Sequence, residues 1–581
     1  MVKFENMKDF KPILVLAIIF TALCIFIPSE NEGPSPAPAG EERMLPEQYA
    51  PRFSRAGGFY SGPFQLKINC PAKGAAIYYT LDGSIPDENA IPYEGPLELT
   101  DRTPWPNMLS AISGVCPEGD YIPPEPVLKG NVVRAVAILP DGSKSRVTNA
   151  TYFIGIDRRQ QIGDTPVISM YVDPEDLFGH ERGIYVLGRL YEDIGEGAEE
   201  TEDAGYIGNC FMRGREWERS AAIDYMPAGM GEKGFSADLG IRIMGGDSRA
   251  YMQKSFRLKC RSEYGEKNIY YNIFPGGQAK YKSIVLRNGG NDYDYARFRD
   301  PMLQELVSDR DMETQRSFPV TLFIDGEYWG MYALCEDYDG HYIENNGYGV
   351  KAENVVIVKN GQIEEGTAED QALFDGMVSF ITENDMSDDK MYSRASGMLD
   401  MKSFADYSAF NIYINNRDSF FMNDNNWMMW RAREAGKGTD KEDGRWRMMV
   451  FDTDYSTGIY EKGTDYDEDT LGDVLEGSSD STGNAMLKSL MRNEAFRGMF
   501  IQALDDMRNR CFEKKRVEEA IDAYLAAYEK PVCDTYRRFG PEDRLWGDPS
   551  EYYRMRVGEL SEWLGGRYEV FDDMMARQFP E

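Results

Sequence analysis

Histidine is nearly absent from this sequence, and its scarcity removes whole classes of chemistry. Among 581 residues only His180 and His341 are histidines, so a metal centre built from several imidazoles is excluded. A Ser-His-Asp triad would have to use one of these two; neither lies in a recognisable motif, and we interpret both as surface or loop residues. The eight cysteines include no CxxC pair, which leaves zinc ribbons and thioredoxin-type centres without support.

Positive charge is also in short supply. The chain has 64 lysines and arginines against 98 aspartates and glutamates, a formal net charge of -34. Proteins that bind nucleic acid need clustered Lys and Arg to replace the counterions of the phosphates. We therefore set nucleic-acid partners aside. An acidic surface is better suited to solubility, or to contact with basic partners or cations.

The N-terminus combines positive charge with a short apolar run. Three lysines precede residues 13–27, which carry no charge and form a run shorter than the about 20 residues of a transmembrane helix. This pattern predicts a signal or anchor segment over residues 1–28 and an extracytoplasmic location, membrane-anchored or secreted, in the cell envelope. Residues 29–50, rich in Pro, Glu and Gly, are expected to form a flexible linker.

Residues 51–155 have the pattern of a small all-β domain. Short β-rich runs alternate with Asp-Gly turn signals, and they lie at residues 64–68, 76–80 and 132–138. The run YYTLDGSIP at residues 78–86 resembles the β-sandwich domain found at the C-terminus of chitobiases. The resemblance implies an accessory domain, either a spacer or a contact to cell-wall glycan. Cys70 and Cys116 could form a disulfide within it.

Residues 156–581 are expected to form a larger α+β unit. Strands are predicted at 240–244, 255–259 and 283–287, a helix at 300–309, and a hairpin over 318–334 with the Asp325-Gly326 turn. Two more strands, at 426–430 and 446–451, follow a helix at 401–414. After about residue 484 the amphipathic spacing predicts a helical C-terminal part.

The segment from residue 415 to residue 454 carries the strongest chemical signal. A helix ends, a loop rich in Asn and Asp follows, and a strand then ends at Asp452 and Asp454. Oxygen ligands of this kind suit Mg²⁺. Arg417-Asp418, followed by Asn423, matches the R-D-x-x-x-x-N loop of kinases, which places a carboxylate beside the attacking hydroxyl. Asn and Asp also favour turns, so a purely structural loop is the alternative.

The order of several longer motifs resembles the CotH kinase family, named for a spore-coat protein. The matching runs cover much of residues 165–570: RIMGGDSR (242–249), QKSFRLK (253–259), VLRNGGND (285–292), FRD (298–300), FIDGEYWGMY (323–332), NNW (425–427) and FDTD (451–454). The resemblance implies an atypical, reduced protein-kinase-like fold that uses ATP and Mg²⁺.

The resemblance also implies roles for individual residues. Asp418 would be the catalytic base, Asp452 a metal ligand, Asn423 the favoured second ligand with Asn426 as its rival, and Asp454 a further candidate. Nucleotide binding is assigned to Lys259 or Lys254, which a strand would point to opposite faces. Further candidates for the nucleotide site are Arg249, Ser248, Glu305 as an ion-pair partner, and Glu336.

These observations favour an exported kinase that transfers the γ-phosphate of ATP to Ser or Thr of a surface or spore-coat protein. Two alternatives stay open: a non-catalytic scaffold of the same fold that assembles an envelope or coat layer, and a carbohydrate-binding surface protein that acts through the β-sandwich.

Export can be tested with a reporter enzyme that is active only outside the cytoplasm, fused after Glu581. We expect activity, because the lysines and the apolar run resemble an export signal. The same fusion without residues 1–28 is the control and should be inactive. An inactive full-length fusion that accumulates stably would contradict the export prediction.

Overall fold

The structure is a computed structural model that describes residues 44–195, 207–229, 231–436, 438–540 and 547–580. The predicted signal or anchor segment and most of the predicted linker lie outside these residues. No helix in the described ranges is both long and apolar enough to cross a bilayer.

The first part of the described chain is all β. Its main sheet has the order β2-β9-β8-β5-β6, formed by Gly58–Tyr60, Thr148–Ile154, Asn131–Ile138, Ala76–Thr80 and Ile91–Pro92. Two small sheets accompany it, β3 (Phe64–Leu66) with β7 (Leu97–Leu99) and β1 (Arg52–Phe53) with β4 (Ile68–Asn69). Leu66 and Leu99 of one small sheet pack with Val133 and Tyr152 of the main sheet. Two β layers therefore enclose one core, as in a small sandwich.

Cys70 and Cys116 are both free thiols in the structure, so the disulfide that the sequence allowed does not form between them. Burial raises the pKa of the Cys116 thiol, which disfavours its reactive thiolate form.

A closed seven-stranded barrel follows. Its order is β10-β11-β12-β13-β14-β16-β15, formed by Val167–Val172, Arg219–Met226, Phe235–Met244, Ser255–Lys259, Ser283–Arg287, Glu327–Glu336 and Ser317–Ile324. All neighbours are antiparallel except β10 and β15, which pair in parallel and close the barrel. The predicted hairpin is confirmed: Asp325 and Gly326 have φ of 44° and 87°, the left-handed pair that a tight two-residue turn requires.

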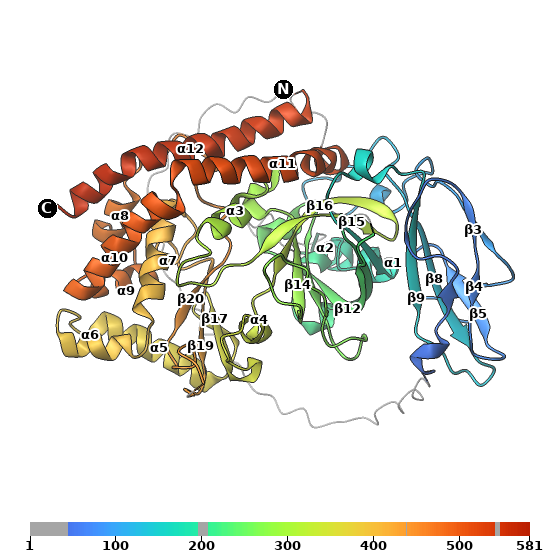
Figure 1. The fold of residues 1–581 in the computed structure, drawn as a ribbon, viewed down its shortest axis with the longest axis horizontal. Helices are drawn as coiled ribbons and strands as arrows, with labels where there is room; N and C mark the ends of the chain where they lie inside the picture. The colour runs from blue at the N-terminus through green and yellow to red at the C-terminus, as the bar shows by residue number, and fades with distance from the viewer. Residues whose placement is uncertain (1–43, 196–206, 230, 437, 541–546, 581) are drawn as a thin grey trace. The chain divides into compact units, whose positions relative to one another are not determined.

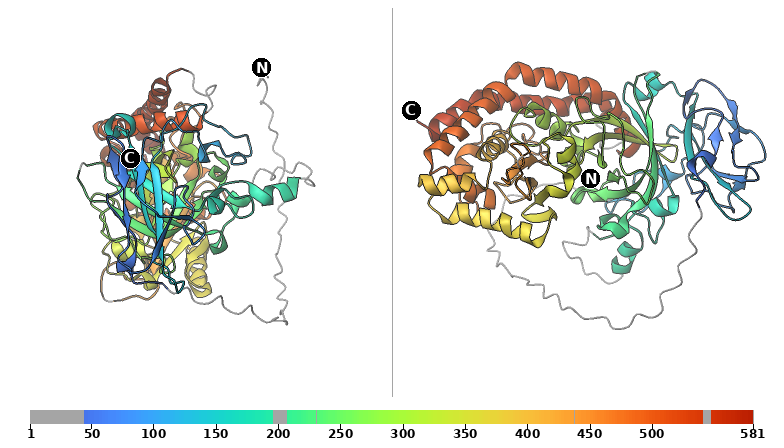
Figure 2. Two further views of the ribbon diagram at one scale, coloured as in Figure 1. Left: turned by 90° about the vertical axis from the view of Figure 1, so that its right-hand side faces the viewer. Right: turned by 60° about the horizontal axis from the view of Figure 1, so that its bottom comes forward.

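Helices and a small sheet form the rest of the chain. The sheet has the order β18-β17-β19-β20, formed by Gln362–Glu365, Val355–Lys359, Trp427–Ala432 and Arg447–Val450. The helices are α1 (Pro174–Phe178), α2 (Gly188–Gly195), α3 (Arg299–Leu306), α4 (Gly340–Asn345), α5 (Ala368–Glu383), α6 (Asp389–Ser396), α7 (Met401–Tyr413), α8 (Thr470–Glu476), α9 (Thr482–Leu490), α10 (Glu494–Asp506), α11 (Lys514–Phe539) and α12 (Pro549–Gln578). The two long helices α11 and α12 lie side by side (Figures 1 and 2). Helix and sheet are thus mixed, as the α+β prediction expects.

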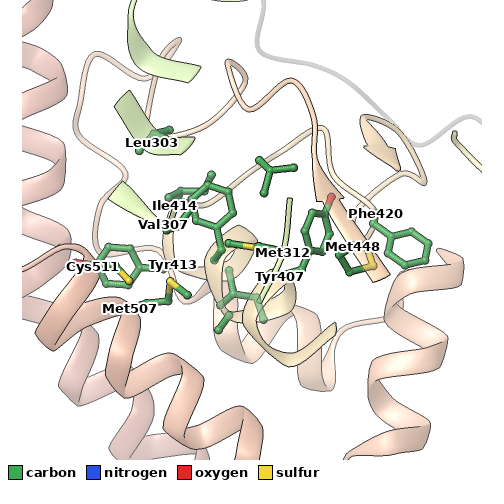
Figure 3. Close-up of a cluster of buried hydrophobic side chains, with 14 of the residues drawn as sticks. Leu303, Val307, Met312, Tyr407, Tyr413, Ile414, Phe420, Met448, Met507 and Cys511 are labelled. Carbon is green, nitrogen blue, oxygen red and sulfur yellow. The ribbon is translucent and has the colours of Figure 1, made fainter. Parts of the chain in front are cut away.

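One large core joins these helices to the small sheet. Figure 3 shows Leu303 and Val307 near Tyr413 and Ile414 at the end of α7, with Met448 of β20 in the same cluster. All five side chains are fully buried. A helix that buries apolar residues on most of its surface, as α7 does, lies inside the domain and fixes the loop that follows it.

The β-domain and the barrel share polar contacts as well as apolar ones. The Lys254 ammonium is fully buried and donates to the backbone carbonyls of Val115, Arg249 and Tyr251 at 3.0, 2.6 and 2.8 Å. The Glu327 carboxylate accepts from the backbone N–H groups of Met108 and Ser110. A buried ammonium with three carbonyl partners has a structural role, since removing it would leave those acceptors unsatisfied.

We expect Lys254→Met to lower the free energy of unfolding by roughly 1–3 kcal/mol, because three buried carbonyls lose their donor. Lys259→Met is the matched control on the next strand: its ammonium is partly exposed and lies 3.9 Å from Asp339, so its removal should change stability by at most about 1 kcal/mol. Denaturant unfolding of both variants measures the difference. Equal stabilities would contradict the structural role of Lys254.

Candidate active site

The loop after α7 is held in place by a buried arginine from the last helix. Arg567 of α12 is fully buried and donates to the carbonyls of Tyr413 and Ile412 at the end of α7, at 2.9 and 3.0 Å. Its remaining bonds reach the carbonyls of Tyr466 and Glu468 and the hydroxyl of Thr470. Carbonyls at a helix end have no partner within the helix, so this guanidinium fixes where α7 stops and where the loop begins.

Asp418 lies in this loop and is surrounded by asparagine amides. Its Oδ1 accepts from the Asn423 amide at 2.6 Å, and its Oδ2 accepts from Asn425 and Asn426 at 2.9 and 2.7 Å. A carboxylate has about four acceptor positions. The three amides fill three of them, which leaves one position, on Oδ1, for a further donor such as a substrate hydroxyl.

The two aspartates after β20 differ sharply in environment. Asp452 follows Phe451 with φ of 53°, and its side chain is 30% exposed, whereas Asp454 is only 1% exposed. Asn426, on the neighbouring loop, also has a left-handed φ of 49°. Asn and Asp tolerate this conformation better than other side chains, and such backbone tends to cluster at functional sites.

A single guanidinium, that of Arg287 at the end of β14, faces three carboxylates. Its Nη2 lies 2.7 Å from Asp452 and also contacts Asp454, and its Nη1 lies 3.9 Å from Asp300. Burial lowers the pKa of a guanidinium, but these carboxylates outweigh it and raise the pKa of Arg287. Burial, followed by repulsion from Asp452 and Asp300, raises the pKa of Asp454. Three carboxylates thus compete for one guanidinium, and the raised pKa favours the protonated, neutral form of Asp454.

Gly290 allows the close approach of this cluster. Its φ is 55°, and a Cβ at this position would lie 2.5 Å from Asp454 Oδ2. Any side chain here would push Asp454 away from Arg287.

Arg287 and Asp452 line a cleft of about 570 Å³ between the barrel and the small sheet. Six basic side chains line it against two acidic ones, Asp452 and Glu364; the basic residues are Arg213, Arg242, Arg249, Arg257, Arg287 and Lys359. Ser248, Asn425 and Asn426 line it as well. In a chain of net charge -34, such a concentration of positive charge marks a site for an anion.

Arg242 and Arg257 strengthen this interpretation. They are direct cross-strand partners on β12 and β13, and both line the cleft. Like charges opposite each other destabilise a sheet, by an amount on the order of 0.2–1 kcal/mol. Glu218 lies 3.6 Å from Arg242, and Asp337 and Glu364 lie 2.9 and 3.9 Å from Arg257, so the two arginines stay side by side with the help of carboxylates around them.

Several predicted site residues lie away from the cleft or are engaged elsewhere. Lys254, the residue before β13, is buried among backbone carbonyls, and Lys259, although on the same face of β13 as Arg257, pairs with Asp339 outside the cleft lining. Glu305 is exposed on α3 and accepts from the Tyr524 hydroxyl at 2.6 Å. Glu336 is buried and bonded to Arg316, so its carboxylate is part of a local ion pair.

Arg249 is a special case, because it does line the cleft. It is 4% exposed and donates to the carbonyls of Gly245, Cys210, Met212 and Ile243. These bonds hold the turn that contains Ser248. They use most of the N–H donors of the Arg249 guanidinium, so few donors remain for a phosphate. The sequence motifs pointed to lysines and did not single out Arg257 or Arg287. Strand alternation, which places Ser255, Arg257 and Lys259 on one face, is the signal that could identify Arg257.

Asp452 and Asn426 bring oxygen donors suited to Mg²⁺ to the cleft. Within the described ranges, no group of three or more His, Cys, Asp or Glu side chains is placed to hold a metal. Asp452 and Asn426 line the cleft together, and an amide that donates through its nitrogen keeps its oxygen as an acceptor. Asp454 is buried behind them. Mg²⁺ typically uses one or two carboxylates with substrate phosphates and waters, which this donor set satisfies.

Comparison with protein families decides the assignment. A family model described as "CotH kinase protein" matches residues 241–570, from the last part of β12 through the loop and into α12. The barrel strands β10 and β11 precede the matched residues. The chain belongs to the CotH kinase family. A second model, "Fn3 associated", matches residues 66–152 of the β-domain. No curated protein matches the chain.

Membership in the CotH kinase family suggests the use of ATP and Mg²⁺ in general. We expect Mg²⁺ to raise the melting temperature of the parent protein, because a divalent cation at Asp452 relieves the repulsion in the Arg287 cluster. At a hundredfold excess over its Kd the stabilisation would be about 2.7 kcal/mol. Melting curves with and without Mg²⁺ measure it.

Asp452→Asn should abolish this Mg²⁺ effect, while Asp467→Asn, which changes an exposed carboxylate outside the cleft, should retain it. An equal response of the parent and Asp452→Asn would show that Mg²⁺ binds elsewhere.

Proposed function

We propose that this chain is a protein kinase that transfers the γ-phosphate of ATP to a Ser or Thr hydroxyl of a surface or coat protein outside the cytoplasm. The observation that carries the proposal is the basic cleft with Asp452 at its edge and Asp418 bonded to two residues of its lining, Asn425 and Asn426. Phosphoryl transfer needs positive charge around the phosphates and a carboxylate at the attacking hydroxyl. Family membership supports the same reaction class.

Asp418 is suited to orient the acceptor hydroxyl. Three amide donors fix its carboxylate, so the remaining acceptor position on Oδ1 points in a defined direction. A hydroxyl that donates to this oxygen would have its own oxygen positioned for attack, and its proton would pass to the carboxylate. The asparagines thus act as positioning residues for Asp418.

Asp452 and Asn426 would hold Mg²⁺ on the phosphates of the nucleotide. Bound there, the metal would neutralise the charge that develops on the transferred group. Arg287 fixes the Asp452 carboxylate through a 2.7 Å bond and thereby sets its direction before any ligand arrives. Preorganised charge of this kind contributes more to catalysis than charge that must reorganise.

Neutralising Asp418 and neutralising Asp452 should have different effects on nucleotide binding and on phosphate transfer. Asp418→Asn should leave Mg-ATP binding nearly intact and reduce phosphate transfer by about 10²–10⁴-fold, as expected for a general base. Asp452→Asn should weaken the metal-dependent binding of the nucleotide itself. Calorimetric titration with ATP and Mg²⁺ gives the binding, and mass spectrometry of autophosphorylation or of an added protein gives the transfer.

Asp467→Asn serves as the control for charge change, and thermal melts show whether each variant is folded. If both site variants bind and transfer like the parent, the assignment of this loop is refuted. If the folded parent transfers no phosphate and binds no nucleotide, the non-catalytic scaffold is the better account.

A further inference from the structure

Lys359 is a cleft residue that the sequence motifs did not single out. It is the last residue of β17, on the small sheet, and it lies in the wall of the cleft opposite the barrel. We propose that Lys359 is the lysine that contacts the phosphates of the bound nucleotide, in place of either barrel lysine. This inference rests on the proposed function and adds the identity of its phosphate-binding residue.

The sheet places Lys359 beside the catalytic loop. Lys359 is paired with Met428 in the β17–β19 ladder, and Trp427 is paired with Val450 in the β19–β20 ladder. In this antiparallel sheet the end of β17, the start of β19 and the end of β20 consequently lie next to one another at one end of the sheet. Three strand ends thus bring Lys359 close to Asn426, which precedes β19, and to Asp452, which follows β20.

Hydrogen bonds of the next residue, Asn360, hold this end of the sheet against the loop that carries Asp418. The Asn360 amide donates to Asn425 Oδ1 at 2.7 Å, and the Trp427 N–H donates to Asn360 Oδ1 at 3.2 Å. The residue after Lys359 is therefore bonded directly to the loop that carries Asp418. A ligand held by Lys359 would lie next to the groups proposed for transfer.

The Lys359 ammonium is held in place by an aromatic ring. Its Nζ lies 4.1 Å from the ring centroid of Phe451, a cation–π contact that leaves the three N–H donors available. Across the residues that the structure describes, this Nζ has no ion pair or hydrogen bond within the protein. Burial, and then the charge of Arg257, lower the pKa of Lys359, so a bound anion would compensate both.

The charged groups around Lys359 come from both walls of the cleft. Arg257 of β13 faces it from the barrel, and the nearest acids are Glu364, Asp452 and Asp337. Among these four residues, only Arg257 carries the positive charge that attracts a phosphate. A polyphosphate placed between Lys359 and Arg257 would bridge the two walls.

The two barrel lysines cannot take this role in the observed arrangement. Lys254 is buried and its donors are used by three backbone carbonyls. Lys259 lies next to Asp339, outside the residues that line the cleft. Lys359 combines a place in the cleft with an ammonium that has no hydrogen-bond acceptor among the residues the structure describes.

An acyl-phosphate derivative of ATP tests this directly, because it acylates a lysine that lies beside the bound phosphates and releases ATP. The full chain would be treated with the probe, with and without excess Mg-ATP, and its peptides mapped by mass spectrometry. We expect labelling of Lys359 that excess Mg-ATP prevents. ATP-protected labelling of Lys259 or Lys254 would overturn the inference and leave the proposed function standing.

Variants supply the second arm of the experiment. Lys359→Met should raise the Kd for Mg-ATP about tenfold or more, Lys359→Arg should restore much of the affinity, and Lys259→Met should bind like the parent. Melting curves confirm that each variant is folded. Parent-like binding by folded Lys359→Met refutes the inference, whereas a parent that binds no Mg-ATP refutes the proposed function and the inference together.

Discussion

The contact of Arg287 with Asp452, Asp454 and Asp300 is the interaction on which the site depends. It joins the end of a barrel strand and the nearby start of α3 to the turn after β20, which lies far along the sequence. Breaking a buried charge network by removing one partner typically costs about 3–5 kcal/mol. The same contact orients the Asp452 side chain. The residues that stabilise the cleft are therefore also residues of the proposed site. Because three carboxylates share one guanidinium, a cation bound at Asp452 would reduce the repulsion among them.

Both walls of the cleft are held in place by residues that do not line it. Arg567 from the last helix fixes the end of α7 and hence the loop that carries Asp418. Lys254 and Glu327 tie the barrel to the β-domain, so that domain is bonded to the residue that precedes β13, the strand that carries Arg257. A site that is assembled from two walls needs such anchors, since small displacements of either wall would change the distance between phosphate-binding and acceptor-orienting groups.

Much of this arrangement could be predicted from residue patterns. The β12–β14 strands, the Asp-Gly hairpin, the helix before the loop and the aspartates after β20 all follow from alternation, helical spacing and turn chemistry. The lysine proposed to bind the nucleotide could not be predicted from the sequence. Strand alternation separates Lys254 from Lys259, but it cannot show that Lys254 is bonded to carbonyls and that Lys259 pairs with Asp339. Lys359 and Arg287 act through contacts between distant strands, and no local pattern reports such contacts. Similarly, the sequence showed two aspartates after β20 but not that Asp454 is buried while Asp452 faces the cleft.

The central claim is that one cleft binds the nucleotide between the barrel and the small sheet, with the metal at Asp452. A crystal structure of the full chain with Mg²⁺ and a non-hydrolysable ATP analogue tests it most directly. The account predicts phosphate oxygens within hydrogen-bond distance of Lys359 and Arg257, and a Mg²⁺ ion coordinated by Asp452. A nucleotide bound elsewhere, or phosphates bound by Lys259, would contradict it.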